Sequence, residues 1–383
     1  MSTAQQPDTY RDLVHRVNTA LEARMASYPD RDQAYHDLCA ILLEFADFLI
    51  QESETATHSE SSIQPPRTDT PVFLCGSMKS GTTLLTQLLD GHPELFVMPG
   101  DSGFIQQNGK WPRTHFADIA RHWIHRLVNP TGKRPFWFLG PDKESLIGFL
   151  INLRANLENT TDTVFSCVVH AISDLRNPNC SPRYWIEKNP HNELHVNELL
   201  DYYPNARFIH ITRNPLENIA SLQRNATVRG WSATPFERAH ELKRLFQAGS
   251  QNRQRLGPSR YHMLRYEDIV TTPEQTMREL AEFLSIDYTE SLLVPTEAGE
   301  VGMSNSMYES DRVTGQIADT SDRQRYLTEL SNEEIRDIVT TLRVDAQKLG
   351  YDWSGPKWDK KQRSPLAQLV RHVTLSVRNR LRR

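Results

Sequence analysis

Cysteines are few in this sequence, and none has the spacing of a metal site. The four are Cys39, Cys75, Cys167 and Cys180, with no C-x-x-C pair and no zinc-ligand spacing among them. A disulfide framework or a structural zinc site is therefore not indicated. Isolated thiols are typical of a reducing compartment, and we expect a cytoplasmic protein.

Long apolar runs and an excess of one charge are also lacking. The most apolar stretch, residues 40–50, contains Glu44 and Asp47 and is too short to cross a bilayer. The first residues have no basic segment followed by an apolar one, so we expect no secretory signal. The net charge is −4 and the pI is about 6.4, which argues against a nucleic-acid partner for the molecule as a whole.

What is present is an ordinary globular composition, 38% hydrophobic and 24% charged over 383 residues, without internal repeats. From about residue 70 onward, short apolar strands alternate with helical periodicity, which predicts an α/β fold with a parallel sheet flanked by helices. Ligands bind such sheets at the carboxyl ends of the strands. The expected strands are 72–75, 163–169, 184–187, 207–212 and 261–264. The expected helices are 82–90, 115–128, 143–158, 191–202, 215–229, 235–255 and 273–284.

Both ends of the chain differ from this central pattern. Residues 8–51 have helical periodicity and are followed at 54–70 by a linker rich in Ser, Thr and Pro. We therefore divide the chain into three parts. They are an N-terminal helical extension with its linker (1–65), a central domain (66–355) and a basic tail (356–383).

The tail predicts a basic amphipathic helix. It has nine Lys or Arg against one acid, Asp359, a net charge of 9 − 1 = +8. Its apolar residues, from Leu366 to Leu381, fall on one helical stripe. Such a helix suits an anionic membrane surface, where it would bring the protein to a membrane-proximal acceptor. The alternative, which the pattern favours somewhat, is packing on the central domain or on a second subunit in a homodimer.

One glycine-rich stretch, CGSMKSGTTLL at 75–85, resembles a phosphate-binding loop with one residue out of place. Gly76 and Gly81 have the spacing of the nucleotide P-loop, G-x-x-x-x-G-K-[ST], and Thr83 stands at its hydroxyl position. The lysine position holds Thr82, and Lys79 occurs three residues earlier. Small residues let the backbone wrap around a phosphate, and the free N–H groups of the following helix attract an anion.

The displaced lysine bears on the ligand. In nucleoside triphosphatases the P-loop lysine reaches the β- and γ-phosphates and magnesium neutralises the rest. A nucleotide whose single phosphate carries a less charged transferable group needs less compensation, and we expect no metal requirement. Lys79 would then stabilise the charge that develops on the leaving phosphate.

The string GSMKSGTTLL resembles the 5′-phosphosulfate-binding loop of the sulfotransferases that use 3′-phosphoadenosine 5′-phosphosulfate (PAPS). DGHPELFV at 90–97 resembles the branch that includes many bacterial members and the protein-tyrosine sulfotransferases. The resemblance covers roughly residues 70–350. It implies direct in-line transfer of a sulfuryl group from PAPS to a hydroxyl or amine. The loop residues that it assigns to the donor are Ser77, Lys79, Ser80, Gly81, Thr82 and Thr83.

A second motif of this family is an Arg at the end of a strand and a Ser eight residues later, which together bind the 3′-phosphate. RFIHITRNPLENIASL at 207–222 supplies Arg213 and Ser221 at that spacing. Pro215 suits the first turn of a helix, and an Arg can grip phosphate with two hydrogen bonds. Taken alone, Arg213 would be expected to pair with Glu217 at i, i+4.

The remaining family elements match less closely. Lys188, in YWIEKNPHN, matches the catalytic lysine at the end of the central strand, although it also suits a solvent-facing strand end. In LRYEDIV (264–270) we interpret Tyr266, Glu267 and Asp268 as scaffold.

The resemblance also implies a loop that closes over the nucleotide. We place it in residues 301–317, whose sequence departs from the Arg-Lys-Gly triplet of the cytosolic enzymes. Its candidates are Ser304, Ser306 and Arg312.

Two residues are candidates for the catalytic base. Asp101 lies about two residues from the acidic position of the protein-tyrosine branch, and His191 lies one residue from the His of the cytosolic enzymes. A histidine titrates near neutral pH and suits the task without help. We favour Asp101 slightly because the surrounding motifs resemble the branch that uses an acid.

The acceptor is the least determined part of the prediction. The segment 108–140 is rich in Trp, Phe, His and Arg, which suits a sugar or an anionic acceptor, although aromatic residues more often form core. Small molecules and lipid-linked acceptors fit equally. Two other functions fit parts of the pattern, a P-loop nucleotide kinase and a non-catalytic nucleotide-binding module. The absent P-loop lysine disfavours the first, and the intact Lys79, Lys188, Arg213 and Ser221 disfavour the second.

Overall fold

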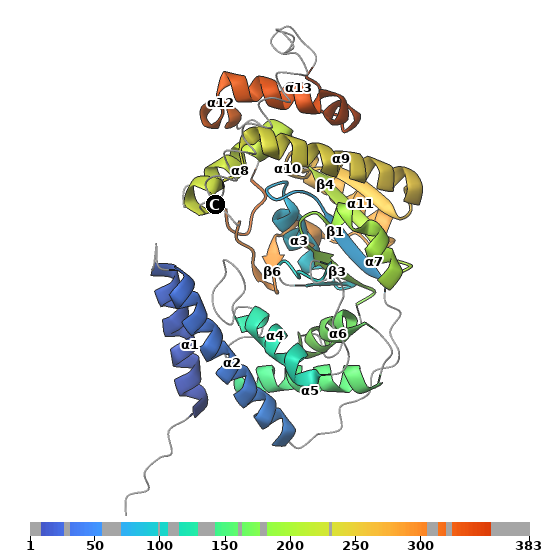
Figure 1. Cartoon of the computed structure of the whole chain (residues 1–383). Helices are drawn as coiled ribbons and strands as arrows, with labels where there is room; N and C mark the ends of the chain where they lie inside the picture. Colours follow the sequence, from blue (N-terminus) through green and yellow to red (C-terminus); the bar gives the residue numbers. More distant parts are fainter. Residues whose placement is uncertain are drawn as a thin grey trace, which may run out of the picture.

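A five-stranded parallel sheet forms the centre of the protein (Figure 1), in the strand order β2-β3-β1-β4-β5. The strands are β1 (Pro71–Cys75), β2 (Leu95–Val97), β3 (Tyr184–Lys188), β4 (Arg207–Thr212) and β5 (Tyr261–Arg265). Because all of them run in one direction, the residues that follow β1, β3 and β4 emerge at a single edge.

The computed structural model describes residues 9–26, 31–55, 70–98, 100–105, 115–128, 142–159, 163–176, 182–229, 232–304, 313–318 and 324–353.

Both faces of the sheet are buried, as a parallel sheet requires. Successive side chains of β1 point to opposite faces. Val72 and Leu74 belong to a core cluster with helices α3 (Thr82–Asp90) and α11 (Pro273–Leu284), whereas Phe73 and Cys75 belong to a second cluster on the other face. All four are fully buried, which explains why the strand has a continuous apolar sequence instead of alternation.

The helices pack in three groups, each with its own core cluster. Those on the Val72 face are α3 (Thr82–Asp90), α10 (Tyr266–Thr271) and α11 (Pro273–Leu284). The core cluster of the Phe73 face extends through six helices, which are α1 (Thr9–Ala26), α2 (Arg31–Thr55), α4 (Phe116–Val128), α5 (Lys143–Asn159), α6 (Val164–Arg176) and α7 (Val196–Tyr202). A third cluster joins α8 (Pro215–Arg229), α9 (Pro235–Leu256) and α13 (Asn332–Lys348), with α12 (Tyr326–Glu329) beside α8.

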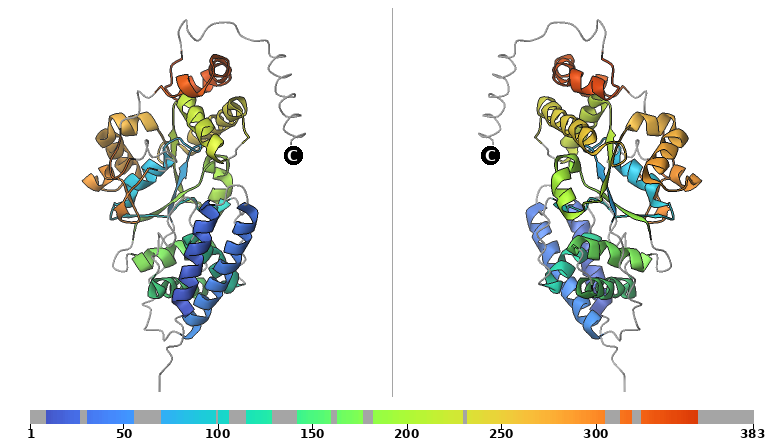
Figure 2. Two further views of the ribbon diagram at one scale, coloured as in Figure 1. Left: turned by 90° about the vertical axis from the view of Figure 1, so that its left-hand side faces the viewer. Right: turned by 90° about the vertical axis from the view of Figure 1, so that its right-hand side faces the viewer.

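The three groups give the molecule an elongated form (Figure 2). α1, α2, α4, α5 and α6 gather at one end, the sheet lies in the middle, and α12 and α13 lie at the opposite end. Leu38, Leu42 and Phe45 of α2 are buried in the same core as Ile119 of α4 and Phe149 of α5. The N-terminal helices thus share a hydrophobic core with the rest of the chain.

The α/β fold with a parallel sheet flanked by helices is confirmed, and most of the expected elements lie within a few residues of their predicted bounds. The predicted strand 163–169 is wrong, because these residues belong to helix α6. Val164 to Val169 are all buried, so the apolar run carries no periodicity that distinguishes a strand from a buried helix. Strand β2, at Leu95–Val97, was not predicted.

Several predicted features fall outside the described residues. They include the basic tail, most of the linker and most of the aromatic segment 108–140. The three-part division of the chain stays a prediction. Within the part of the chain that the structure describes, no helix is long and apolar enough to span a membrane.

Phe45 provides a test of the shared core. Its side chain is fully buried, and the centroid of its ring lies 5.8 Å from the centroid of the Tyr10 ring on α1. We expect Phe45→Ala to lower the free energy of unfolding by about 3–5 kcal/mol, the usual cost of an aromatic side chain in a core. Leu43→Ala on the same helix, where the residue is 49% exposed, should cost less than about 0.5 kcal/mol. Chemical denaturation measures both, and equal costs would contradict the shared core.

Candidate active site

The loop from Gly76 to Gly81, between β1 and α3, lies at the carboxyl edge of the sheet. Gly76 has φ 141° and Gly81 has φ 104°, conformations that other residues rarely adopt. A Cβ would lie 2.6 Å from the Ile211 carbonyl oxygen at Gly76, and 2.4 Å from the Tyr266 ring at Gly81. The two glycines therefore allow the loop backbone to pass against β4 and α10.

The middle of the loop is a tight turn. The backbone N–H and the hydroxyl of Ser80 both donate to the Ser77 carbonyl, at 3.2 and 2.6 Å. Helix α3 begins immediately afterwards with Thr82, which is buried, and Thr83, which is half-buried. The positive end of the helix dipole thus falls at the end of the loop, where it favours an anion.

Arg213 contacts the loop from the end of β4. Its guanidinium donates to the Lys79 carbonyl at 3.1 Å and stacks over the Tyr266 ring, 4.6 Å from the ring centroid. The two family motifs, separated by more than a hundred residues in the sequence, are therefore in direct contact. Arg213 also acts on Glu217, since burial raises the pKa of that carboxyl group and the positive charge of Arg213 works against the rise.

Helix α8 brings a further side chain to the loop. The amide of Asn218 donates to the Ser77 hydroxyl and to the Met78 carbonyl, each at 3.0 Å. Ser221 is half-buried one turn further along and on the same helix face as Asn218, since residues three apart are neighbours. Ser221 thus belongs to the face of α8 that contacts the loop.

Two of the predicted catalytic residues form an ion pair. Lys188 ends β3, directly beside Leu74 of β1, and its ammonium pairs with the Asp101 carboxylate. The Lys188 side chain is 12% exposed and the Asp101 side chain 51% exposed. Arg126 of α4 donates to the Asp101 carbonyl oxygen. Asp101 is thus accessible to an acceptor while it is held next to Lys188.

His191 has different partners. Its backbone N–H donates to the Gly76 carbonyl at 3.4 Å, and its Nε2 lies 3.3 Å from the carboxylate of Glu241 on α9. Arg238 pairs with the same carboxylate at 2.8 Å. Burial lowers the pKa of His191. The two candidate bases therefore have separate neighbours, Lys188 for Asp101 and Glu241 for His191.

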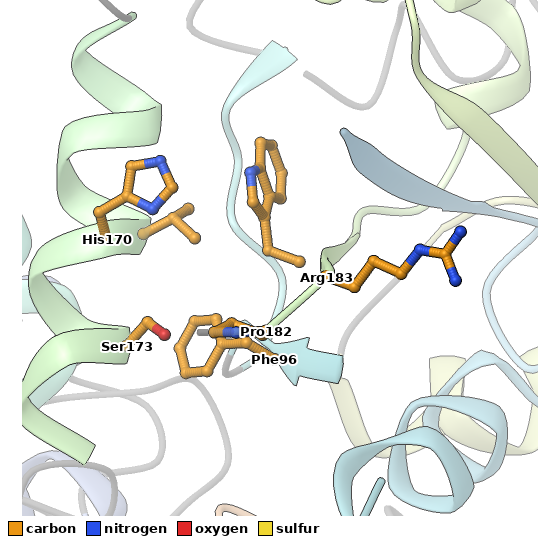
Figure 3. A pocket seen from close by; sticks show the side chains of 7 residues that line it. Phe96, His170, Ser173, Pro182 and Arg183 are labelled. Atoms are coloured by element: carbon orange, nitrogen blue, oxygen red, sulfur yellow. The ribbon is translucent and has the colours of Figure 1, made fainter. Parts of the chain in front are cut away.

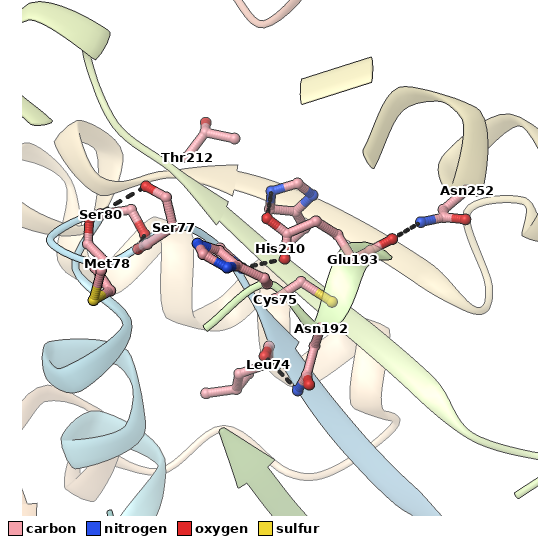
Figure 4. A network of polar contacts seen from close by, with 12 residues as sticks. Leu74, Cys75, Ser77, Met78, Ser80, Asn192, Glu193, His210, Thr212 and Asn252 are labelled. Atoms are coloured by element: carbon pink, nitrogen blue, oxygen red, sulfur yellow. Dashed lines mark hydrogen bonds and ion pairs between the residues drawn. The ribbon is translucent and has the colours of Figure 1, made fainter. Parts of the chain in front are cut away.

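Beneath the loop lies a buried polar network (Figure 4). The carboxylate of Glu193 accepts the Gly76 N–H at 3.0 Å and lies 3.8 Å from Nε2 of His210. His210 is in turn 2.9 Å from the Tyr261 hydroxyl, and Asn252 donates to the Glu193 carbonyl at 2.8 Å. Burial raises the pKa of Glu193 to about 7 and lowers that of His210 to about 3. The first amide of the loop is thus fixed by a buried carboxyl group.

The segment expected to close over the nucleotide begins beside α3. Ser304 and Val313 are hydrogen bonded to each other, with N–H groups donating to the Val313 carbonyl and the Ser304 hydroxyl at 2.9 and 3.1 Å. Gln87 of α3 donates to the Met303 carbonyl at 2.8 Å. A short hairpin, β6 (Thr296–Glu297) and β7 (Glu300–Val301), precedes them. Ser306 and Arg312 lie outside the described residues.

A cavity of about 20 Å³ lies between α6 and the strands β2 and β3, lined by Phe96, His170, Ser173 and Trp185 among others (Figure 3). It adjoins Arg183, at the end of β3 opposite to Lys188. Its volume suits a single water molecule and no larger ligand. Because it lies at the other end of β3 from Lys188, this cavity is separate from the candidate active site.

Some residues of the site gave no signal in the sequence. Asn218 and Glu193 contact the loop through side chains that no motif marks. Tyr266 was interpreted as scaffold, and the structure adds that its ring touches both Arg213 and the position of Gly81. Asn218 lies five residues after Arg213, on the first turns of α8. This short separation from Arg213 is the only sequence feature that connects Asn218 with the loop.

Comparison with known proteins agrees with this geometry. Residues 71–290 match the model of the sulfotransferase family, which is more than half of the chain. The chain therefore belongs to the sulfotransferase family. A sulfotransferase domain from the curacin biosynthetic pathway has a similar fold, with a TM-score of 0.50 and 18% identity. That alignment covers 76% of this chain and all of the domain.

Two curated relatives have names that give different acceptors. A protein-tyrosine sulfotransferase of Drosophila melanogaster is 22% identical over 73% of this chain and 51% of its own length. Omega-hydroxy-beta-dihydromenaquinone-9 sulfotransferase Stf3 of Mycobacterium bovis is 26% identical over 57% of this chain and 63% of its own length. The chain thus spans less than two thirds of each of these relatives.

Glu193 gives the site a testable pH dependence. Its pKa rises from 4.5 to about 7 on folding, so between these values the folded protein holds a proton that the unfolded chain has released. The stability that results is fully present below pH 4.5 and is lost as the pH rises to 7. We expect the difference in unfolding free energy between the wild type and Glu193→Gln to fall across this window.

The slope should not exceed about 1.4 kcal/mol per pH unit, the limit for one proton. Chemical denaturation of both proteins at several pH values measures it. Comparing the two proteins cancels the opposing titration of the buried histidines that do not contact Glu193. A difference that is constant, or that grows with pH, would contradict the raised pKa of Glu193.

Proposed function

We propose that this protein is a sulfotransferase that moves a sulfuryl group from PAPS to a hydroxyl or amine acceptor. One observation carries the proposal: Arg213 is hydrogen bonded to the altered phosphate loop, at the edge of the sheet where Lys188 also lies. Membership of the sulfotransferase family supports it. A nucleotide kinase would lack its P-loop lysine here, because Thr82 occupies that position.

The residues at this edge divide into two phosphate sites. The backbone and hydroxyls of Ser77 and of residues 80–83 would hold the 5′-phosphosulfate at the start of α3. Arg213 and Ser221, on the β4–α8 side, would hold the 3′-phosphate, with Arg213 providing the charge. Ser304 and Arg312 are proposed for the segment that covers the nucleotide. Both phosphate sites need positive charge without a metal ion, and lysine and arginine side chains supply it.

The chemistry requires the acceptor to lose a proton while the sulfuryl group is transferred. The acceptor oxygen or nitrogen forms a bond to sulfur, and the bond from sulfur to the 5′-phosphate oxygen breaks, which leaves adenosine 3′,5′-bisphosphate. Asp101 takes the proton of the acceptor, and His191 is the second candidate for this step. Lys79 and Lys188 stabilise the charge that develops on the leaving phosphate and the sulfuryl oxygens.

Donor binding can be tested without knowledge of the acceptor. We expect adenosine 3′,5′-bisphosphate to bind in the presence of EDTA, and more tightly than ATP with magnesium. Arg213→Ala should weaken this binding roughly ten- to a hundredfold, because a hydrogen bond to a charged group contributes about 1.5–3 kcal/mol. Isothermal titration calorimetry measures both quantities.

Arg278 offers a matched control for Arg213. It also stacks on a tyrosine, Tyr288, with its guanidinium 3.8 Å from the ring centroid, but it lies on α11 and pairs with Glu274. Arg278→Ala should leave nucleotide affinity unchanged. Preference for ATP with magnesium, or an equal loss of affinity in the two variants, would refute the assignment.

For the acceptor we propose a hydroxyl or amine of a small molecule, a carbohydrate or a lipid-linked compound. The two relatives act, by their names, on protein tyrosine and on a hydroxylated menaquinone, so the family does not restrict the choice. A membrane-proximal acceptor would fit the basic tail, and packing of the tail on the domain or in a homodimer is the competing proposal.

Co-sedimentation with liposomes separates these proposals for the tail. If the tail binds anionic lipid, the intact protein should pellet with liposomes in proportion to their anionic content. Salt should weaken the pelleting, and truncation after Gly355 should abolish it, because the tail carries a net charge of +8. Failure of the intact protein to pellet at low salt would exclude the membrane contact.

A further inference from the structure

A carboxyl group at the end of β3 is buried beside the candidate active site and is not a candidate for direct chemistry. Glu187 immediately precedes Lys188, and only 1% of its surface is exposed, so no acceptor can reach it. A buried carboxylate is costly unless it is hydrogen bonded. Burial raises the pKa of Glu187 to about 7, and hydrogen bonds from Ser102 and Asn192 act against that rise.

Both oxygens of Glu187 have donors from different segments. The Ser102 hydroxyl donates to Oε1, and the Asn192 amide donates to Oε2 at 2.8 Å. The same amide also donates to the Leu74 carbonyl at 3.1 Å, at the end of β1. Glu187 therefore joins the segment that contains Ser102 to the two central strands of the sheet.

Ser102 is held at several atoms. Its hydroxyl accepts the Phe104 N–H at 2.9 Å, its backbone N–H donates to the Lys188 carbonyl at 3.4 Å, and its side chain is buried. The neighbouring segment has little stiffness of its own, because Gly100 and Gly103 on either side have φ of 64° and 66°. The Ser102 hydroxyl therefore adds a side-chain anchor to the two contacts that hold the backbone here, from Ser102 N–H to the Lys188 carbonyl and from Arg126 to the Asp101 carbonyl.

Asp101 is the residue that this anchor affects. Its side chain is half exposed and forms an ion pair with Lys188. We propose that Glu187, acting through the Ser102 hydroxyl, positions Asp101 opposite Lys188 for the transfer reaction. Glu187 and Ser102 are thus positioning residues, and the proposal rests on the function proposed for Asp101.

Ser102→Ala removes the link while it leaves Asp101 and Lys188 intact. With PAPS as donor and a tyrosine peptide, a phenol and a primary alcohol as probe acceptors, we expect turnover to fall about tenfold or more. The affinity for adenosine 3′,5′-bisphosphate should stay within about twofold. Glu187→Gln, which keeps the side-chain shape, should act in the same direction. Ser173→Ala is the control, because Ser173 is equally buried but lies on α6 at the small cavity.

A double-mutant cycle tests whether Ser102 acts through Asp101. Asp101→Asn should lower turnover, and adding Ser102→Ala should then cause no further loss, because residues that act as a unit are not additive. Independent losses that multiply in the double variant would overturn the proposal. So would a Ser102→Ala variant with wild-type turnover when Asp101→Asn is inactive.

Acetylation of Lys188 by an N-hydroxysuccinimide ester, followed by mass spectrometry, gives a readout that needs no acceptor. The ion pair and burial should protect Lys188 in the wild type. Labelling should rise several-fold in Ser102→Ala and in Asp101→Asn, rise no further in the double variant, and stay unchanged in Ser173→Ala. Protection of Lys188 that persists in a folded Ser102→Ala variant would overturn the positioning role.

The two proposals fail in different ways. Full activity of Asp101→Asn would remove Asp101 as the base, and with it the catalytic part of the inference. Absence of adenosine 3′,5′-bisphosphate binding by the wild type would refute the sulfotransferase assignment itself. In both cases the labelling of Lys188 still decides whether Ser102 holds Asp101 in place.

Discussion

The close approach of the loop 76–81 to its neighbours is the constraint on which the site depends. Gly76 passes against the backbone of β4, and Gly81 passes against the Tyr266 ring, with no room for a Cβ at either position. Because the loop is this close to β4, Arg213 at the end of that strand reaches the Lys79 carbonyl. The same proximity places Asn218 of α8 on Ser77 and Met78. The phosphate loop is therefore shaped by β4, α8 and α10 as much as by its own sequence.

Buried carboxyl groups support this edge from below. Glu193 holds the first amide of the loop, and Glu187 holds the segment that carries Asp101. Both are fully buried, and burial raises the pKa of each to about 7 because it disfavours the charged form. Hydrogen-bond donors from separate segments offset that cost, and they make the positions of several loops mutually dependent. A polar network of this kind specifies geometry at some cost in stability.

How far the sequence predicts this arrangement varies with the kind of signal. The phosphate loop, Arg213 and Lys188 follow strands with strong apolar patterns, so both their elements and their shared edge could be predicted. Residues 163–169 could not, because a fully buried helix and a buried strand have the same continuous apolar sequence. Glu193 and Glu187 were missed for another reason. Glu193 binds the Gly76 amide and Glu187 binds the Ser102 hydroxyl, both distant in sequence, and no spacing rule records such contacts.

The packing of α1 and α2 has a consequence for how the chain acquires its structure during synthesis. The apolar residues of α2 are buried against α4 and α5, but α2 ends at Thr55 and α5 ends only at Asn159. At about 5–20 residues per second, the ribosome needs several seconds or more to deliver that partner. A nascent chain therefore presents an uncovered apolar helix surface during this interval. General chaperones that bind apolar surfaces would recognise α2 during this interval.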